Sequence, residues 1–524
     1  MKTNKKTTDS WVAGRQTWAV LVLACLVMLM CSACLVATGQ IRPPAGDGQT
    51  YYVSLTGNDA NKGITEETAF RTIKKGVSVL HAGDTLIIKS GDYGNDQSVI
   101  TDSGTKDALI TIKAEEPGKV VVNTGGKGAG MLFPSKAYIV VEGIKFTNCS
   151  PGMSIRALPW NQVGHASHHI TVRKCIFQNN PGNGISLSGG NPGNRSNSHH
   201  HLFEQNTFID NGPKDVQDYG VYMYYSRDVK ILNNYFYGLH HQACSFKKCV
   251  SNGLVRGNVF EGFLYSAVYL GQNDDDERED NHRCYNLTVE GNVFRPAKGY
   301  RAKRAICVAN VSDAIVRNNF IDSIYGDHTA LQVAANSTGA KVHGNFIIGV
   351  LKEWGVELAT SDCEFYNNTV AECDIGLAII KGANPLIRNN IFYKNKQQVR
   401  ILPTRIYKPG KQGDHGSRFL PDKTQLWTWQ PDHAREPLFE HNNFFPQWDG
   451  MGKTDISVDP KFAGPFTKLK AGQLNPKFIP NMERAQAYSL TKSSPCIDKG
   501  LQMALPLSYS GAAPDLGAFE VDQN

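Results

Sequence analysis

The sequence lacks the cysteine pattern of a disulfide-stabilised or zinc-binding protein. Of its 12 cysteines, nine follow residue 40, and these nine are widely scattered without a CxxC pair. Disulfide frameworks and structural zinc sites depend on an even number or on close spacing of cysteines. The pattern therefore argues against both and predicts that several cysteines occupy core positions.

Concentrated charge of either sign is also missing. The formal net charge is +7 in 524 residues, and the basic residues are dispersed along the chain. Without a recognised binding motif, dispersed basic residues argue against nucleic acid as a partner, whereas the mild positive charge favours an acidic one. A hydrophobic content of 41% allows the chain to bury a large core. We expect the protein to be a monomer.

Charged residues are absent from the 22-residue run Thr17 to Thr38, which follows Lys2, Lys5, Lys6 and Arg15. The run is long enough to cross a bilayer. It also ends close to "CSAC", a small-residue pattern typical of a bacterial cleavage or lipidation site. Residues 1–40 therefore fit a cleaved signal peptide, a lipid anchor on Cys34 or an uncleaved anchor. Each alternative predicts an exported protein, in the cell envelope or secreted, that meets a membrane only through this segment.

A tandem repeat dominates the remaining sequence. Motifs such as "RGNVF", "EGNVF" and "RNNIF" carry an asparagine followed two positions later by an apolar residue, ending with Asn443 and Phe445. The asparagines occupy positions 206, 234, 258, 292, 319, 345, 368, 390 and 443. The first seven intervals are 28, 24, 34, 27, 26, 23 and 22 residues. Periods of this size with strand-like sequence are typical of a solenoid of short strands.

Each repeat also contains a small residue followed by alternating apolar positions, as in "GVYMY", "ACSFK" and "AVYLG". Period-two alternation predicts strands with one buried face. Stacked coils would align the apolar residues into ladders, and asparagines at a repeated bend would hydrogen-bond one another along the stack. We therefore predict an all-β fold, a single-stranded right-handed parallel β-helix.

The predicted organisation has four parts: the leader 1–40, an N-terminal cap and first coil 41–100, the β-helix 101–400, and an excursion with C-terminal coils 401–524. The stretch "AFRTIKKGVSVL", residues 69–80, predicts an amphipathic helix that covers the open end of the stack, and "GDTLIIKSGDY", residues 83–93, predicts the first strand. Residues 401–440 interrupt the repeat. Trp427 and Trp429 within them are either sugar platforms or packing residues.

The opening "YYVSLTGNDANKG" and the closing motifs "SVDPKF", "SPCIDKG" and "PDLGAFE" resemble exported β-helix proteins of the polysaccharide lyase type. The segment "SFKKCVSNGLVRGNVF" is similar to the lysine-bearing coil of chondroitinase B and related alginate lyases, and family 9 pectate lyases also carry a lysine in such a strand. This resemblance implies an acidic polysaccharide substrate and Lys247 as the base. Two positions depart from it. Leu270 replaces an arginine of the first group, and "QDYGVY" retains only Asp218 of the calcium cluster of the second.

Side chains that point outward from the alternating strands form the candidate site. Cleavage of a uronic-acid chain by β-elimination requires a base for the C5 proton, neutralisation of the carboxylate and a proton for the departing oxygen. The catalytic candidates are Lys247, Tyr222, Tyr269 and His241. The substrate-binding candidates are Tyr224, Ser245, Gln272, Arg304, Gln332 and Glu357. A surface lysine among exposed β-forming tyrosines is the plain structural alternative.

Acidic residues concentrate in "DDDERED", residues 274–280. Calcium takes several oxygen ligands, so Asp274, Asp275 and Asp276, together with Asp218, are candidate ligands for a calcium cofactor. A solvated loop is the alternative. The histidines at 168–169 and 199–201 are interpreted mainly as polar residues at coil bends.

Three functional classes fit these patterns unequally. A polysaccharide lyase for an acidic glycan is the leading hypothesis. A non-catalytic glycan-binding or adhesion protein would use the same stack and tyrosines. A glycoside hydrolase is disfavoured, because such enzymes need paired carboxylates and the outward rows contain Glu357 alone.

Overall fold

The computed structural model describes residues 48–94, 97–158, 166–190, 198–212, 219–271, 283–297, 300, 302–324, 328–334, 337–352, 354–360, 362–380, 383–402, 437–464, 489–502 and 512–518. The chain divides into a unit of residues 1–47 and a unit of residues 48–524. The predicted leader and most of the predicted excursion, with Trp427 and Trp429, lie outside the described residues. Within the described ranges, no helix is long and apolar enough to cross a membrane.

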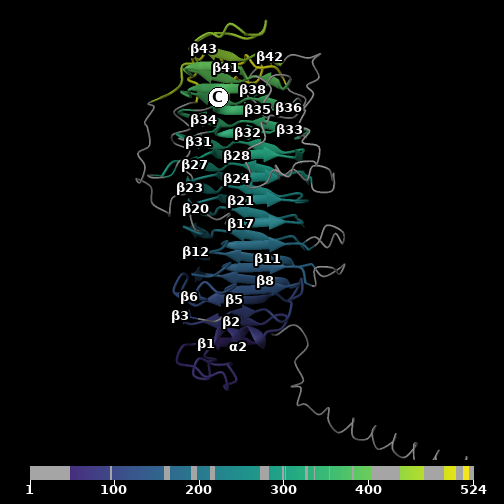
Figure 1. The fold of residues 1–524 in the computed structure, drawn as a ribbon, viewed down its shortest axis with the longest axis vertical. Coiled ribbons are helices and arrows are strands. Elements are labelled where there is room, and N and C mark those ends of the chain that lie inside the picture. The colour runs from purple at the N-terminus through teal and green to yellow at the C-terminus, as the bar shows by residue number, and fades with distance from the viewer. Residues whose placement is uncertain are drawn as a thin grey trace, which may run out of the picture. The chain divides into compact units, whose positions relative to one another are not determined.

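Short parallel strands stack coil upon coil from β1 to β43 (Figure 1), and the chain passes in turn through three sheets, A, B and C. Sheet A contains β1 Thr50–Val53, β2 Thr85–Ile88, β5 Ile110–Ala114, β8 Ala137–Glu142, β11 His168–Arg173, β15 Leu202–Glu204, β19 Lys230–Leu232, β22 Leu254–Arg256, β26 Thr288–Glu290, β30 Ile315–Arg317, β33 Ala340–His343, β36 Cys363–Tyr366, β39 Leu386–Arg388 and β42 Leu438–Glu440, with β14 Ser198–His199 and β18 Ser226–Arg227 at its side. Sheet B contains β3 Gly91–Gly94, β6 Val120–Asn123, β9 Ile144–Thr147, β12 Ile176–Gln178, β16 Thr207–Ile209, β20 Tyr235–Leu239, β23 Val259–Phe263, β27 Val293–Arg295, β31 Phe320–Asp322, β34 Phe346–Ile348, β37 Thr369–Ala371, β40 Ile391–Tyr393 and β43 Asn443–Phe445.

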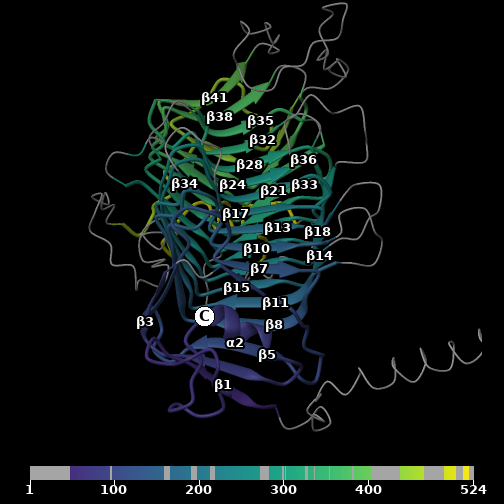
Figure 2. The same ribbon diagram turned by 60° about the horizontal axis from the view of Figure 1, so that its bottom comes forward.

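Sheet C contains β4 Ser98–Val99, β7 Met131–Pro134, β10 Met153–Arg156, β13 Ile185–Ser188, β17 Tyr219–Tyr224, β21 Gln242–Lys247, β24 Ser266–Gly271, β28 Arg304–Ala309, β32 Leu331–Val333, β35 Trp354–Leu358, β38 Ile375–Ile380 and β41 Gln397–Leu402. A short pair, β25 Cys284–Tyr285 and β29 Val311–Ser312, forms beside these sheets. Figure 2 shows β7, β10, β13, β17 and β21 following one another along sheet C. The predicted right-handed parallel β-helix is confirmed.

The core follows the predicted ladders. In sheet C, the inward row runs through residues paired in register and fully buried: Ile185, Val221, Cys244, Val268, Ile306, Leu331, Val356 and Leu377. In sheet B, the inward row contains six consecutive phenylalanines, whose ring centroids are 4.6–5.2 Å apart: Phe146, Phe177, Phe208, Phe236, Phe260 and Phe294. Phenylalanine rings one coil apart stack because the spacing of the coils is close to the centroid distance that offset-stacked aromatic rings prefer.

The asparagines form a buried hydrogen-bonded ladder at the bend between sheets A and B. Each member accepts hydrogen bonds at Oδ1 from the backbone N–H and the side-chain amide of the preceding member. For Asn258 and Asn292 these distances are 2.9 and 3.0 Å. The residue before each ladder asparagine has positive φ, as at Asn233, Gly257 and Asn318. Glycine and asparagine tolerate this conformation best, which explains the recurring "GN" and "NN" pairs.

The last rung of the ladder differs from the prediction. Asn442, not Asn443, accepts from Asn390, and Phe444, not Phe445, stacks on Phe392 at 4.8 Å. The pairing of Ile391 with Asn443 sets this register. The two asparagines are adjacent, so the sequence motif alone could not distinguish them.

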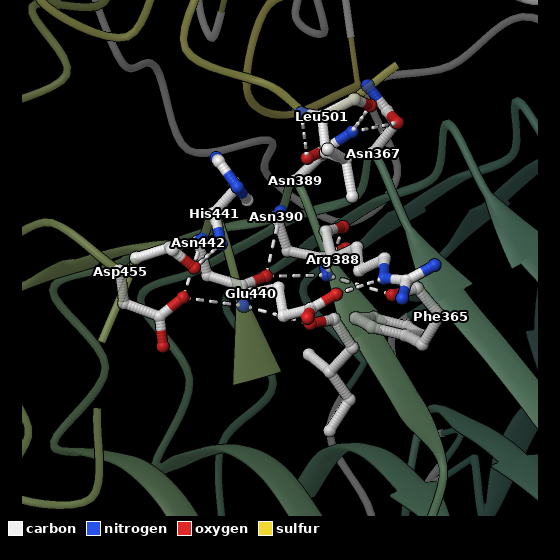
Figure 3. Close-up of polar contacts among 12 residues, drawn as sticks. Phe365, Asn367, Arg388, Asn389, Asn390, Glu440, His441, Asn442, Asp455 and Leu501 are labelled. Carbon is white, nitrogen blue, oxygen red and sulfur yellow. Dashed lines mark hydrogen bonds and ion pairs between the residues drawn. The ribbon is translucent and has the colours of Figure 1, made fainter. Parts of the chain in front are cut away.

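Asp455 ends the ladder. Figure 3 shows its carboxylate facing Asn442, and Oδ1 of Asp455 accepts from the backbone N–H of Asn442 at 2.7 Å and from its side-chain amide at 3.0 Å. Burial raises the pKa of Asp455. The same view shows Leu501 next to Asn389. The side-chain amide of Asn389 donates to the Leu501 carbonyl at 2.8 Å. The C-terminal segment is thus tied to the last described coils.

The N-terminal end is covered by helix α2, Ile73–Ser78, which is shorter than predicted. Thr72 caps it by accepting from the Lys75 N–H at 3.1 Å, and Ile73 and Val77 are buried against the stack. The first strand is β1, on which β2 pairs in parallel, so the prediction that residues 83–93 form the first strand was wrong. Those residues instead form β2 and the start of β3 in two different sheets.

The cysteines behave as core residues, as predicted. None of the nine cysteines in the described ranges forms a disulfide, and eight of them are buried.

Replacing Asn292 by alanine should destabilise the β-helix by about 3 kcal/mol, because the buried amides of Asn258 lose their acceptor. Urea unfolding followed by circular dichroism would measure the loss. Asn286 is exposed and has positive φ, and its side chain donates to Asn252 at 3.3 Å, so Asn286→Gly is the matched control, with little expected change. Equal midpoints for both variants would contradict a structural role for the ladder.

Candidate active site

The outward row of sheet C brings several predicted site residues into one line. Tyr222, Ser245, Tyr269, Cys307, Gln332 and Glu357 are paired in register on successive strands. A parallel row begins two residues further along each strand, where Tyr224 pairs with Lys247. Strand pairing therefore places Tyr222, Tyr224, Lys247 and Tyr269 on neighbouring coils, as predicted.

Much of this outward row is buried, which differs from the predicted solvent-facing surface. Ser245 and Cys307 are fully buried, Tyr269 is 4% exposed, and Glu357 is 2% exposed. Tyr269, Cys307, Ala309 and Ala334 form a small apolar cluster of their own. Alternation along the strands correctly assigned the outward direction but contained no information about what covers that face.

Lys247 lies half-buried at the C-terminal end of β21. Its Nζ lies 4.4 Å from the centroid of the Tyr269 ring on the next coil. On the previous coil, the rings of Tyr222 and Tyr224 lie 5.5 Å apart. The lysine ammonium group thus contacts a tyrosine of the next coil, and Lys247 pairs in register with Tyr224 of the previous coil.

The bend before sheet C adds a second group of side chains. The His241 ring stacks on Tyr265 at 4.9 Å and meets the edge of Tyr219 at 5.2 Å. Lys303 Nζ lies 4.8 Å from the centre of the same Tyr265 ring. Tyr265 and Tyr219 were not predicted as site residues. Their signal was available in sequence, since each occupies the position at or just before the start of a sheet C strand.

Arg304 opens β28 and bridges these groups. Its guanidinium lies 5.7 Å from the Tyr265 ring, and its Nη2 is 3.0 Å from Nε2 of His328. Burial acts to lower the pKa of Arg304, but its interactions with Cys307 and Tyr265 outweigh burial and raise it. Arg304 is therefore a permanently charged cation in a largely buried position.

Positive charge concentrates around His241. Burial, with Lys247 and Lys303 nearby, lowers the pKa of His241 to about 4. Burial raises the pKa of the Cys307 thiol to about 11, although Arg304 and Lys247 act to lower it. A neutral imidazole and a neutral thiol thus lie within the field of three cations, which suits an anionic ligand.

Three buried polar atoms at this place have no hydrogen-bond partner in the part of the chain that the structure describes: Ser245 Oγ, His241 Nδ1 and Arg304 Nε. A buried polar atom without a partner is costly, at about 1–3 kcal/mol. The three atoms belong to β21, to the bend before it and to the first residue of β28.

Other predicted residues are not brought to Lys247. Gln332 and Glu357 continue the outward row on coils beyond Cys307, so Glu357 lies about 14 Å, three coil spacings, from Tyr269. Gln332 accepts from the Cys307 thiol at 3.4 Å. Gln272, Asp218, Asp274, Asp275 and Asp276 lie outside the described residues. Among the described residues, no group of three or more His, Cys, Asp or Glu side chains is arranged to hold a metal ion.

Comparisons with known families support the fold. A family described as "Pel9A-like, right handed beta helix region" matches residues 51–217, and one described as "Right handed beta helix region" matches residues 163–347 and 301–405. The predicted resemblance to β-helix proteins of the polysaccharide lyase type is confirmed at this level. No curated protein sequence matches the chain.

Similar solved structures include two lyases and one glycosidase. The GH136 lacto-N-biosidase from Eubacterium ramulus is 12% identical, with a TM-score of 0.45 over 68% of this chain and 67% of that one. Pectate lyase Pel9A is 15% identical, with a TM-score of 0.37 over 91% of this chain and 98% of that one. The PL6 family alginate lyase AlyGC is 13% identical, with a TM-score of 0.42 over 80% of this chain and 55% of that one. At these identities, the likeness shows the fold alone.

The His241 imidazole should remain neutral down to about pH 5. The pKa in the folded protein is about 4, below the usual 6.5 of the unfolded chain, so the folded state binds fewer protons between these values. The contribution of His241 therefore makes stability fall as the pH drops from about 6.5 to about 4.

Ring carbon-proton NMR spectra recorded against pH would measure this pKa, with the His241→Gln spectrum identifying the signal. A midpoint above pH 6 for His241 would contradict its burial beside two lysines.

Proposed function

We propose that this protein is a lyase that cleaves a uronic-acid-containing polysaccharide by β-elimination, with Lys247 as the base. The observation that carries the proposal is the grouping of Lys247, Lys303 and Arg304 around His241, Tyr265 and Tyr269, at the bend before sheet C and on the strands that follow it. A cationic, aromatic and partly buried surface suits a sugar ring that bears a carboxylate.

The cations divide the work of the reaction between them. Arg304 or Lys303 would bind the uronate carboxylate, and a guanidinium can do so with two parallel hydrogen bonds. Neutralising this carboxylate makes the C5 proton more acidic. The amine of Lys247 then removes that proton, and the electron pair of the C5–H bond forms the C4–C5 double bond while the C4–O4 bond breaks.

The departing O4 requires a proton. Tyr222 and Tyr269 flank Ser245 in the outward row, so a phenol hydroxyl is the candidate donor on either side of the lysine. The products are one chain end with an unsaturated uronate and one with a free hydroxyl, which balances the atoms of the cleavage.

A non-catalytic glycan-binding protein is the second candidate, and one observation favours it. Lys247 Nζ lies over the face of the Tyr269 ring, and such a contact stabilises the protonated ammonium form. A protonated lysine binds an anionic sugar well but cannot remove a proton. The same residues would then serve adhesion to an acidic polysaccharide.

Calcium and export also belong to the proposal, since both rest on sequence. The calcium ligands would be Asp218, Asp274, Asp275 and Asp276, which lie outside the described residues. The leader 1–40 supports export and attachment to the cell envelope through that segment alone.

Lys247→Ala should lower lyase activity at least about a hundredfold, because it removes the base. The measurement is the rise in absorbance at about 235 nm that the unsaturated uronate produces. The substrates are pectate, alginate, chondroitin, dermatan, heparin and ulvan, each tested with calcium and with a chelator. Lys230→Ala is the control, since Lys230 is an exposed lysine on a sheet A strand.

The outcomes separate the two candidates. A rise with wild type and Lys230→Ala that Lys247→Ala eliminates supports the lyase and identifies its substrate. Binding of one of these glycans without any rise, and weaker binding by Lys247→Ala, favours the binding protein. Unchanged activity in Lys247→Ala would refute the assignment of the base.

Arg304→Gln should lower kcat/KM by about ten- to a hundredfold, because a charge-assisted hydrogen bond contributes about 1.5–3 kcal/mol. Steady-state kinetics on the substrate found above would measure the change. The matched control is Arg256→Gln, whose arginine is 55% exposed and contacts Glu290 at 3.5 Å. Equal losses in both variants would contradict carboxylate binding by Arg304.

A further inference from the structure

Four histidines lie together where the chain enters sheet A, and the proposed reaction does not use them. We name His168, His169, His199 and His200 the histidine patch. His168 begins β11 and pairs with His199 of β14 on the next coil. His169 and His200 follow them with positive φ. The two histidine pairs therefore have the same backbone geometry, one coil apart.

The rings are arranged with unusual regularity. His168 stacks on His199 at 4.9 Å and 2°, and His169 stacks on His200 at 4.8 Å and 8°. Within each pair the rings are nearly perpendicular and the two Nδ1 atoms face each other, at 2.9 Å for His168 and His169 and at 2.8 Å for His199 and His200. Each pair thus holds two Nδ1 atoms close together in a hydrogen bond, which an ion would replace once the shared proton has moved to an Nε2 atom.

We propose that the histidine patch binds one divalent transition-metal ion, of the copper(II) or nickel(II) type, through the Nδ1 atoms of a histidine pair. Metal–imidazole bonds are about 2.0–2.1 Å long. Two such bonds to nitrogens 2.8–2.9 Å apart enclose an angle of about 90° at the metal. This is the cis angle of the tetragonal geometry that copper(II) and nickel(II) adopt with nitrogen ligands.

The surroundings hold the ligands in place. Tyr138 stacks on His169 at 4.6 Å, which restricts the imidazole and lowers the entropy lost on metal binding. Burial lowers the pKa of His168 and of His169, which favours the neutral ligand form. The geometry of the pairs, not this pKa change, carries the inference.

The charges beside the histidine patch, and the repulsion between bound ions, bear on how many ions the patch can bind. Asp228 Oδ2 lies 3.6 Å from Nδ1 of His200 and 2.7 Å from Nη1 of Arg227, so the arginine largely offsets the carboxylate. Among the described residues no three His, Cys, Asp or Glu side chains are arranged around one point, and the remaining ligands would be water. Two divalent ions one coil apart would repel each other strongly, so we expect a single ion per chain.

The test uses the full chain without a polyhistidine tag. Copper(II) or nickel(II) is titrated by isothermal calorimetry, and copper(II) spectra by electron paramagnetic resonance report nitrogen ligation. Wild type should bind one ion with two nitrogen ligands. The variant in which all four histidines of the patch are replaced by asparagine should bind at least tenfold more weakly and lose the nitrogen signature.

Two further variants keep the result interpretable. His441→Asn is the control, because His441 is partly exposed and lies in the C-terminal coils, away from the histidine patch, and it should bind like wild type. His169→Asn with His200→Asn changes only the two turn residues, so it tests the patch even if the fourfold variant does not fold. Equal affinity and equal spectra in wild type and in either patch variant would overturn the proposal.

Discussion

The register between successive coils is the constraint on which the other features depend. Parallel pairing repeats the same position every coil, and the buried asparagine ladder fixes the bend at which sheet A becomes sheet B. An asparagine that slipped by one residue would place its amide against apolar side chains and leave the preceding amide without an acceptor. The shift from Asn443 to Asn442 at the last rung shows that backbone pairing, not the motif, decides which of two asparagines is used.

The candidate site follows directly from this register. Residues 23 to 38 positions apart in sequence, such as Ser245, Tyr269 and Cys307, become neighbours in one row. The same repetition brings cations from β21 and β28 to one tyrosine-rich surface, although a single coil could not supply them. A β-helix can therefore assemble a site from one or two residues per coil while each coil remains a plain structural repeat.

The repeat produces other local clusters by the same rule. The histidine patch and the row of phenylalanines in sheet B both arise because similar residues occupy equivalent positions on adjacent coils. In the core such stacking stabilises the fold, since rings exclude water. On the outside it gathers imidazoles at a spacing set by the backbone, so that the ligands are positioned before any ion binds.

The sequence by itself determined the repeat, the fold class, the inward rows and the outward direction of Lys247, because these follow from spacing and alternation within the chain. It did not determine the burial of Ser245, Tyr269 and Cys307, the stacking of His241 on Tyr265, or the contact of Arg304 with His328. Those depend on which side chains from other coils meet at the bend before sheet C. Only the tertiary structure decided them, since strand periodicity specifies the face of a residue but not its neighbours across coils or what covers that face.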